Sequence, residues 1–204
     1  MNQPGPRRSG EETRRSVLRA AEEVFARVGY AGARMEDIAD RSGIRRASFV
    51  YYYRDKPTLY GALLDDLFDG LDARYAAELA GPGSLTERML RCIDVWAERV
   101  ESRPSLLRIS LWEMARAEAS EPVPLASRVQ PLVVRLSEAV REGQRQGVLR
   151  SDFDAIGFVM SVAGTTAFLG RRTALLSSVV SPPLQPGALA AELRSWVARV
   201  LFVD

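Results

Sequence analysis

Residues 35–53, MEDIADRSGIRRASFVYYY, decide the fold. The pattern predicts two short helices joined by a turn at residues 42–44, where a glycine allows the chain to change direction. Ile38 and Ala39 on the first helix can pack against Phe49 on the second, and Ala39 is small enough for the two helices to cross closely. This spacing is typical of a helix-turn-helix, whose second helix can lie in the major groove of DNA.

The three consecutive tyrosines fit this arrangement, because neighbouring residues on a helix face different directions. Phe49 and Tyr53 are four residues apart and therefore face the core together, while Tyr52 lies at the edge of that face. The outward positions carry an arginine, a hydroxyl and a phenol, which suit phosphates and base edges. These outward residues are Arg46, Ala47, Ser48, Val50 and Tyr51.

The rest of the chain is predicted to be helical, with about nine helices in all and no strand. Outside the helix-turn-helix, apolar residues recur at helical spacing over 13–28, 55–79, 85–101, 105–119, 125–146, 154–178 and 189–200. Gly29 stands where a helix C-cap belongs, and Asp55 is a good N-cap for the helix that follows it. We expect an all-α protein with a flexible arm over 1–12, an N-terminal helix-turn-helix domain over 13–60 and a C-terminal helical domain over 61–204.

The composition excludes several kinds of chemistry. The 204 residues include no histidine and a single cysteine, Cys92. Histidine acid–base catalysis, a Ser-His-Asp triad, histidine metal ligands and an intrachain disulfide are therefore ruled out. Cys92 lies among apolar residues and is expected to be a buried structural thiol. The uncharged stretch 155–170 has 16 residues, fewer than the ~20 that span a bilayer, so we expect no membrane segment and a cytoplasmic protein.

The charge is unevenly distributed along the chain. The net charge is +2, but residues 1–60 hold 12 Lys and Arg against 8 Asp and Glu, and residues 61–204 hold 16 against 18. The basic excess therefore lies in the same part of the chain as the helix-turn-helix. This distribution indicates a polyanion as the partner of the N-terminal domain.

Residues 13–60 resemble the DNA-binding domain of the TetR family of bacterial transcriptional regulators. The matching residues, in order, are Thr13-Arg14, Ala20-Ala21, Phe25-Ala26, Gly29-Tyr30, Asp37-Ile38-Ala39, Gly43-Ile44, Tyr51-Tyr52-Tyr53, Lys56 and Leu59-Tyr60. The all-α remainder has a suitable length for the family's ligand-binding and dimerisation domain. The resemblance therefore implies two domains with different tasks.

The resemblance implies a repressor that binds a palindromic double-stranded DNA operator as a homodimer and is released by a small-molecule effector, without a cofactor. An activator would have the same sequence features. Lys56 resembles the family's phosphate-binding lysine, and a helix N-terminus adds its own attraction for phosphate. The expected DNA contacts are Arg45, Arg46, Ala47, Ser48, Val50, Tyr51, Tyr52 and Lys56.

Three residues depart from the family's pattern. Arg34 and Arg45 stand where the family usually has capping Ser or Thr residues before the two helices, and each lost cap costs ~1 kcal/mol. Val50 replaces a tyrosine that usually contacts phosphate. The operator sequence of a relative therefore cannot be transferred to this chain.

Apolar and small residues in the C-terminal region give candidate sites. A ligand pocket is expected around Met89, Trp96, Trp112, Glu113, Phe158 and Met160. The last two helices resemble the family's dimer-forming pair, with small residues that permit close approach and apolar residues that supply area. The expected dimer contacts are Gly157, Ala163, Gly164, Ala167, Trp196, Val197 and Val200.

Two other classes of function stay open from the sequence. An enzyme is disfavoured because histidine, a metal-ligand cluster and a phosphate-binding glycine loop are all missing, although carboxylate or tyrosine chemistry is not excluded. A helical protein-interaction module that does not bind DNA is the second alternative, and the departures at Arg34, Arg45 and Val50 are what favour it.

Overall fold

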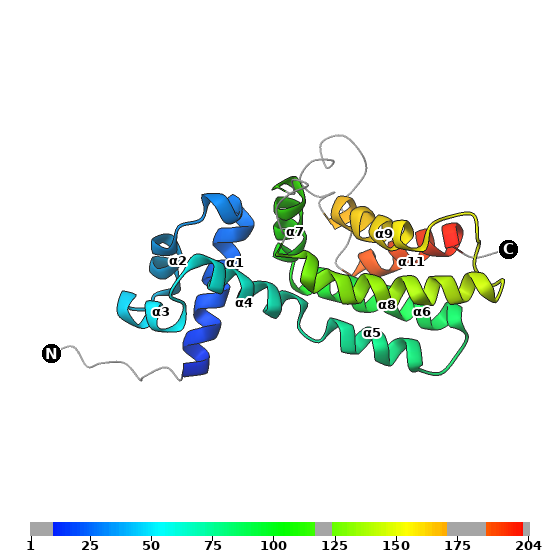
Figure 1. Ribbon diagram of the computed structural model, residues 1–204, viewed down its shortest axis with the longest axis horizontal. Coiled ribbons are helices and arrows are strands. Elements are labelled where there is room, and N and C mark those ends of the chain that lie inside the picture. The colour runs from blue at the N-terminus through cyan, green and yellow to red at the C-terminus, as the bar shows by residue number, and fades with distance from the viewer. Residues whose placement is uncertain (1–9, 117–123, 171–186, 202–204) are drawn as a thin grey trace. The chain divides into compact units, whose positions relative to one another are not determined.

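The computed structural model describes residues 10–116, 124–170 and 187–201, and the regular elements in these ranges are helices (Figure 1). This confirms the all-α fold class. The helices are α1 (Gly10–Gly32), α2 (Met35–Ser42), α3 (Arg46–Tyr52), α4 (Lys56–Phe68), α5 (Leu71–Ala80), α6 (Leu85–Ser102), α7 (Ser105–Arg116), α8 (Ala126–Arg145), α9 (Ala155–Gly170) and α11 (Ala188–Leu201). Residues 1–9 of the expected arm and 171–178 of the expected helix over 154–178 lie outside the described residues.

The chain forms two compact units, which differ from the expected division at residue 60. The first unit comprises residues 1–67 and 108–125, and the second comprises 68–107 and 126–204. Most of α7 therefore belongs to the first unit, although it is separated from α4 in the sequence by two helices. This grouping could not be predicted from the sequence, because the apolar periodicity of a helix does not indicate which unit the helix packs on.

The core of the first unit forms where the apolar stripe of α1 meets the following helices. Val17, Val24 and Phe25 on α1 are almost fully buried, as is Ile38 on α2. Four leucines of α4 complete this core, namely Leu59, Leu63, Leu64 and Leu67. Burial of these aliphatic and aromatic side chains is what orders the short helices α2 and α3, which are too short to be stable alone.

The break in α1 occurs at the glycine that the sequence singled out. Gly29 has φ 70° and ψ 176°, so the helical conformation is interrupted there before the chain resumes a last turn. A Cβ atom at this position would lie 3.0 Å from the indole ring of Trp112 on α7. Gly29 is therefore required twice, by the backbone conformation and by the close approach of Trp112.

The single helix expected over 55–79 is two helices, α4 and α5. The chain breaks at Gly70, which has φ 71°. Leu67 and Leu71 are both fully buried on either side of the break. The leucine spacing of four runs through the break without a change, and for this reason the periodicity predicted one continuous helix.

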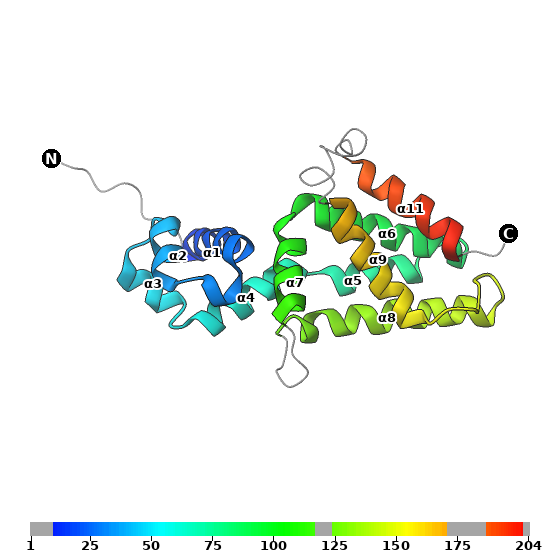
Figure 2. The ribbon, with the colours of Figure 1, turned by 90° about the horizontal axis from the view of Figure 1, so that it is seen from above.

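The second unit is a layered helical bundle, in which α6 packs between α5 and α11 while α8 packs against α5 and α9 (Figure 2). Cys92 is buried as expected, and burial raises the pKa of its thiol to about 12. Trp96 on α6 donates a hydrogen bond from Nε1 to Thr166 Oγ1 on α9 at 3.0 Å. Arg135 on α8 forms a two-pronged ion pair with Asp72 on α5, at 2.7 and 2.9 Å. Within the described residues, no helix is both long and apolar enough to cross a membrane.

Replacing Gly29 with alanine tests both requirements at that position. We expect Gly43→Ala, which also has a positive φ but open space around the new Cβ, to lower the free energy of unfolding by ~1–2 kcal/mol through backbone strain alone. Gly29→Ala should cost at least ~1 kcal/mol more, because its backbone conformation is one that only glycine adopts readily and because the Trp112 ring must also move. Urea unfolding of both variants gives the comparison, and equal costs would show that Trp112 does not constrain this position.

Candidate nucleic-acid interface

Helix α3 is held on the first unit by two aromatic side chains. Phe49 is 2% exposed and Tyr53, just after the helix, is 4% exposed. The turn before α3 is fixed by Gly43, which has φ 65°, and by the buried Ser42 hydroxyl. Ser42 Oγ donates to the carbonyl of Ala39 at 2.7 Å and accepts from the amide of Ile44 at 3.3 Å. The predicted core face of the second helix is therefore confirmed, and the turn is rigid.

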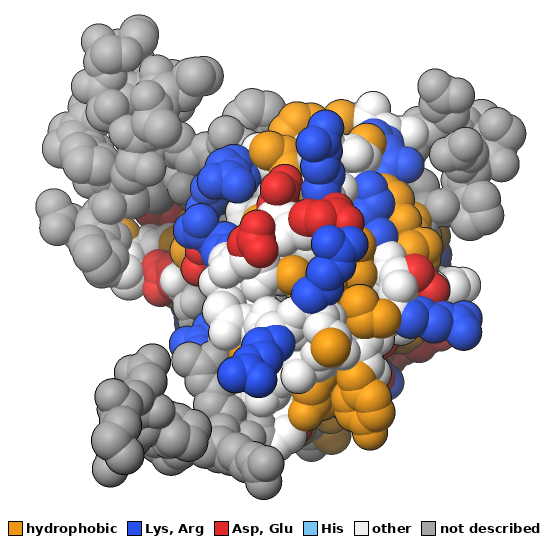
Figure 3. Space-filling view, turned by 90° about the vertical axis from the view of Figure 1, so that its left-hand side faces the viewer, with side chains coloured by type: hydrophobic (Ala, Val, Ile, Leu, Met, Phe, Trp, Pro, Cys, Tyr) orange, Lys and Arg blue, Asp and Glu red, His pale blue; other side chains and the backbone are white. Residues whose placement is uncertain are grey.

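The opposite face of α3 is open. Val50 is 50% exposed and Tyr51 is 84% exposed, and Arg46, Ala47 and Ser48 are exposed as well. Figure 3, which views the molecule from the side of the first unit, shows exposed hydrophobic side chains among arginines and acidic residues. Tyr52 is half-buried and its ring packs edge-on against that of Tyr51 at 5.4 Å. The structure thus leaves Arg46, Ala47, Ser48, Val50 and Tyr51 accessible on the outward side of α3, with Tyr52 at its edge.

The helices α2 and α3 lack side-chain N-caps, as expected. Arg34 and Arg45 occupy the N-cap positions of α2 and α3, and neither side chain caps its helix. By contrast, Asp55 accepts a hydrogen bond from the amide of Thr58 at 2.8 Å, which confirms its role at the start of α4. The pKa of the Asp55 carboxyl is lowered, first by a hydrogen bond with the Thr58 side chain and then by this bond from the Thr58 amide.

Lys56 has internal partners that the sequence did not indicate. Its ammonium donates to the carbonyl oxygens of Tyr30 and Ala33, at 2.9 and 3.0 Å, and lies 4.6 Å from the centre of the Tyr30 ring. Two of its three N–H groups are therefore used to join the start of α4 to the connection between α1 and α2. A phosphate contact by the third N–H stays a prediction.

Two exposed ion pairs join the helices of the helix-turn-helix to one another and to α1. The Arg46 guanidinium lies 3.3 Å from Glu36 on α2, and both side chains are exposed. Arg41 on α2 forms an ion pair with Glu23 on α1. Because such pairs contribute little when exposed, the Arg46 side chain can exchange Glu36 for a phosphate at small cost.

Residues of α7 complete the first unit beside Tyr30 and Tyr60. Glu113 is only 3% exposed and lies 3.9 Å from Arg116, whose guanidinium lies 5.2 Å from the centre of the Tyr30 ring. Burial raises the pKa of the Tyr60 phenol, and the Glu113 carboxylate raises it further. Glu113 and Trp112, both expected at a ligand pocket, are therefore part of the unit that carries α3. The sequence does show a carboxylate beside an apolar stripe at this position. It does not show which unit this helix belongs to.

The remaining pocket candidates lie in the second unit and only partly converge. Met89 and Phe158 share a buried cluster, against which Trp96 packs. Met160 is 44% exposed on α9. Within the second unit, Met89, Phe158 and Trp96 thus lie together while Met160 is exposed, and a ligand contact by any of the six candidates stays a prediction.

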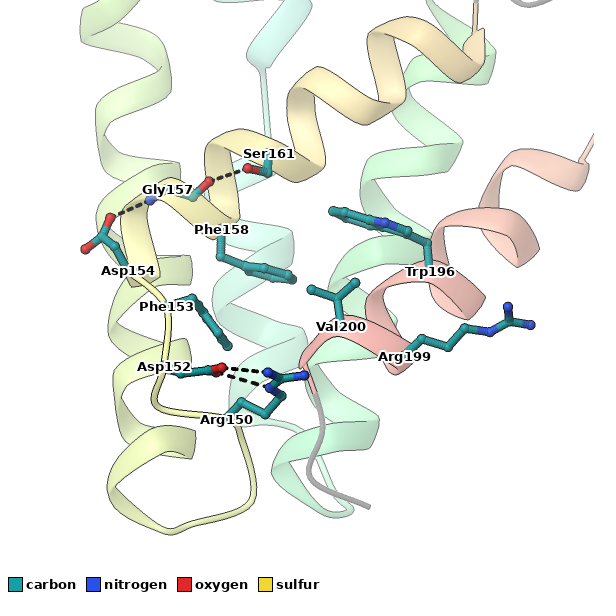
Figure 4. A pocket seen from close by; sticks show the side chains of 10 residues that line it. All are labelled: Arg150, Asp152, Phe153, Asp154, Gly157, Phe158, Ser161, Trp196, Arg199 and Val200. Atoms are coloured by element: carbon teal, nitrogen blue, oxygen red, sulfur yellow. Dashed lines mark hydrogen bonds and ion pairs between the residues drawn. The ribbon is translucent and has the colours of Figure 1, made fainter.

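A surface groove of about 480 Å³ lies between the α8–α9 connection, α9 and α11 (Figure 4). Its aromatic wall is formed by Phe158, which stacks on Trp196 at 6.2 Å and packs against Phe153 at 5.4 Å. At its polar end, Arg150 forms an ion pair with Asp152 at 2.6 Å. The groove therefore offers both apolar and charged groups to a partner.

The expected dimer contacts divide into surface and core. Gly157, Trp196 and Val200 line the groove. Ala163 and Gly164 are partly exposed on α9, whereas Ala167 and Val197 are buried inside the unit, Val197 to 1% exposure. Sequence spacing missed Ile156, which is 44% exposed on α9.

Among the described residues, no group of three or more histidine, cysteine, aspartate or glutamate side chains is placed to hold a metal ion. What the first unit offers instead is an exposed helix on a rigid turn, with basic residues at its start. Such an arrangement fits the major groove of a duplex.

Two family models match the chain, one in each region. The model described as "Bacterial regulatory proteins, tetR family" matches residues 17–63, which contain the helix-turn-helix. The model described as "Tetracyclin repressor-like, C-terminal domain" matches residues 86–200, more than half of the chain.

Named relatives agree with these models. The chain is 30% identical to the HTH-type transcriptional repressor SCO4008 of Streptomyces coelicolor over 70% of each protein. It is 23% identical to the HTH-type transcriptional repressor NicS of Pseudomonas putida, covering 92% of this chain and 90% of NicS.

Solved structures show the same fold. The fatty acid degradation regulator FadR from Bacillus halodurans has a TM-score of 0.71 at 14% identity, with 96% of each chain covered. The ketosteroid transcriptional regulator KstR2 of Mycobacterium tuberculosis has a TM-score of 0.68 at 22% identity, with 97% of this chain and 98% of that one covered.

Replacing Lys56 with methionine separates its internal role from a DNA contact. Lys56→Met keeps the aliphatic stem but leaves two carbonyl groups without their charged donor, so we expect the free energy of unfolding to fall by ~1–3 kcal/mol without DNA. Arg54→Met is the control, because the Arg54 side chain is 84% exposed and its loss should change stability by less than ~0.5 kcal/mol. Chemical denaturation measures both.

If Lys56 also contacts phosphate, the slope of log affinity against log salt should fall by ~0.9 in Lys56→Met. If Lys56→Met is as stable as Arg54→Met, Lys56 has no internal stabilising role. An unchanged salt slope in Lys56→Met would remove Lys56 from the DNA contacts.

Proposed function

The chain belongs to the TetR family of bacterial regulatory proteins, and from this we propose that it is a ligand-responsive repressor that binds a palindromic operator as a homodimer. Its relatives are named transcriptional regulators and repressors, not enzymes. DNA-binding transcription regulation is therefore the chain's general function. The repressor role, the palindromic operator, the dimer and the effector are the parts that we propose.

The observation that carries the proposal is the open face of α3. Phe49 and Tyr53 hold the helix from one side, and Arg46, Ala47, Ser48, Val50 and Tyr51 are exposed on the other side. A helix with one exposed face fits the major groove. Arg45 and Arg46, at the start of the helix, supply positive charge for the phosphates beside the groove.

A homodimer would bring two such helices onto one duplex. The support for it is an exposed apolar surface on α9 and α11, where Ile156 and Met160 are each 44% exposed and Val200 is 36% exposed. These residues adjoin Gly157 and Trp196 of the groove. A two-fold axis through this surface would bury the same residues on both copies.

Release by a small molecule requires only that the effector prefer one dimer geometry over another. Tenfold weaker operator binding corresponds to a coupling free energy of ~1.4 kcal/mol. The cluster that contains Met89 and Phe158 is a candidate for the effector contact, because it includes buried residues of α9 and α11, the helices of the proposed dimer surface. An effector there would change the packing of α9 and α11.

Selection from a random duplex library tests the DNA-binding proposal. We expect the full chain to recover a palindromic site with two half-sites about one or more helical turns apart, as two copies of α3 require. Binding should weaken steeply with salt, because phosphate contacts release counterions. Recovery of no duplex at low salt would favour a protein-interaction module, and a site without two-fold symmetry would contradict the dimer.

Charged substitutions on α9 test the dimer surface. We expect wild type to sediment at twice the chain mass, and Ile156→Arg with Met160→Arg to sediment as a monomer, because two buried charges per copy would face each other. Val134→Arg with Val148→Arg is the matched control, since those valines are 47% and 40% exposed elsewhere in the second unit. A dimer that survives the α9 substitutions, or dissociates equally in the control, would place the interface elsewhere.

A further inference from the structure

The centre of the open face of α3 is apolar. Ala47 and Val50 are three residues apart and Ala47 and Tyr51 are four apart, so these three side chains adjoin one another on the helix surface. All three are exposed, Val50 to 50%. Exposed apolar residues are common singly, but Val50 adjoins two further exposed residues, and its exposure leaves it available to a partner.

The same face offers few groups that can distinguish bases by hydrogen bonds. Within Arg46–Tyr52 there is no Asn, Gln, Lys or Glu, and the hydroxyls of Ser48 and Tyr51 can each donate or accept. Arg46 is the sole residue of α3 capable of bidentate recognition of guanine, and it lies at the first position, beside Glu36. Ala47 and Val50, by contrast, can contact bases only through apolar atoms.

In the major groove, the base that presents an apolar group is thymine, through its 5-methyl. We propose that Val50 reads a thymine methyl group in the operator, with Ala47 beside it completing the apolar contact. This inference rests on the proposed function, because it requires α3 to lie in the major groove. The inference makes residue 50, where the family usually has a tyrosine, a determinant of the operator sequence that this chain prefers.

The geometry of the helix fits this contact. Cβ atoms three residues apart on a helix are about 5–6 Å apart, which is comparable to the spacing of methyl groups on successive base pairs, given a rise of ~3.4 Å. A thymine or a pair of thymines in each half-site can therefore be covered by Val50 and Ala47. The Ser48 hydroxyl lies on the far side of the helix from Val50, so it cannot replace the contact.

Deoxyuridine provides the test, because it differs from thymidine only by the 5-methyl group and pairs in the same way. The duplex recovered by selection is remade with each thymidine of one half-site replaced in turn by deoxyuridine. Affinities are measured at one salt concentration for wild type, Val50→Ala and Val134→Ala. Val134 is the matched control, since it is 47% exposed and lies on α8.

For wild type and Val134→Ala, we expect the replacement of one thymidine to weaken binding about fourfold, the factor that corresponds to ~0.8 kcal/mol for one buried methyl group. Val50→Ala should bind the unmodified duplex about as weakly as wild type binds the modified one. Val50→Ala should also bind the unmodified duplex and the duplex with deoxyuridine at the contacted position with equal affinity. Equal thermal unfolding of the three proteins would show that the substitutions act on binding rather than on folding.

Two results overturn the inference while leaving the proposed function standing. One is wild-type binding that no single replacement weakens. The other is a replacement penalty that Val50→Ala retains in full. A chain that binds no duplex from the library overturns the proposed function and this inference together.

Discussion

The ammonium group of Lys56 holds together the part of the chain on which DNA recognition depends. It joins the start of α4 to the carbonyl groups of Tyr30, in the last turn of α1, and of Ala33, just after α1, and the ring of Tyr30 lies beside it. Because α3 lies between α2 and α4 in the sequence, fixing these neighbours fixes both ends of the recognition helix. Charged hydrogen bonds of this kind each contribute ~1.5–3 kcal/mol, enough to matter in a unit whose second and third helices have only eight and seven residues.

Local pattern predicted the helix-turn-helix well. The core positions Phe49 and Tyr53, the exposed Val50 and the cap at Asp55 all follow from helical spacing and capping chemistry, and the structure confirms them. Gly70 was missed because the leucine pattern runs unchanged through the break, and a positive φ leaves no mark in periodicity. The sites in the rest of the chain depend on which helices meet. That information resides in tertiary packing rather than in any single segment.

The groove between α9 and α11 shows how one residue can belong to the core and line a surface at once. Phe158 is 9% exposed and belongs to the core cluster, yet its ring also lines the groove where Trp196 stacks on it. A change in the packing of that cluster would therefore alter the shape of the groove. Since interiors are densely packed and do not deform continuously, such a change favours discrete arrangements. This is the physical condition under which an effector and a dimer interface can influence each other.

The approach of Trp112 to Gly29 has a consequence for building chimeric regulators. The DNA-binding unit is not a contiguous piece of sequence, since residues 108–125 belong to it together with residues 1–67. A graft that exchanges only the N-terminal segment between relatives would join one protein's Gly29 and Tyr60 to another protein's α7. Matching Trp112 and Glu113 to the new segment is then part of the graft.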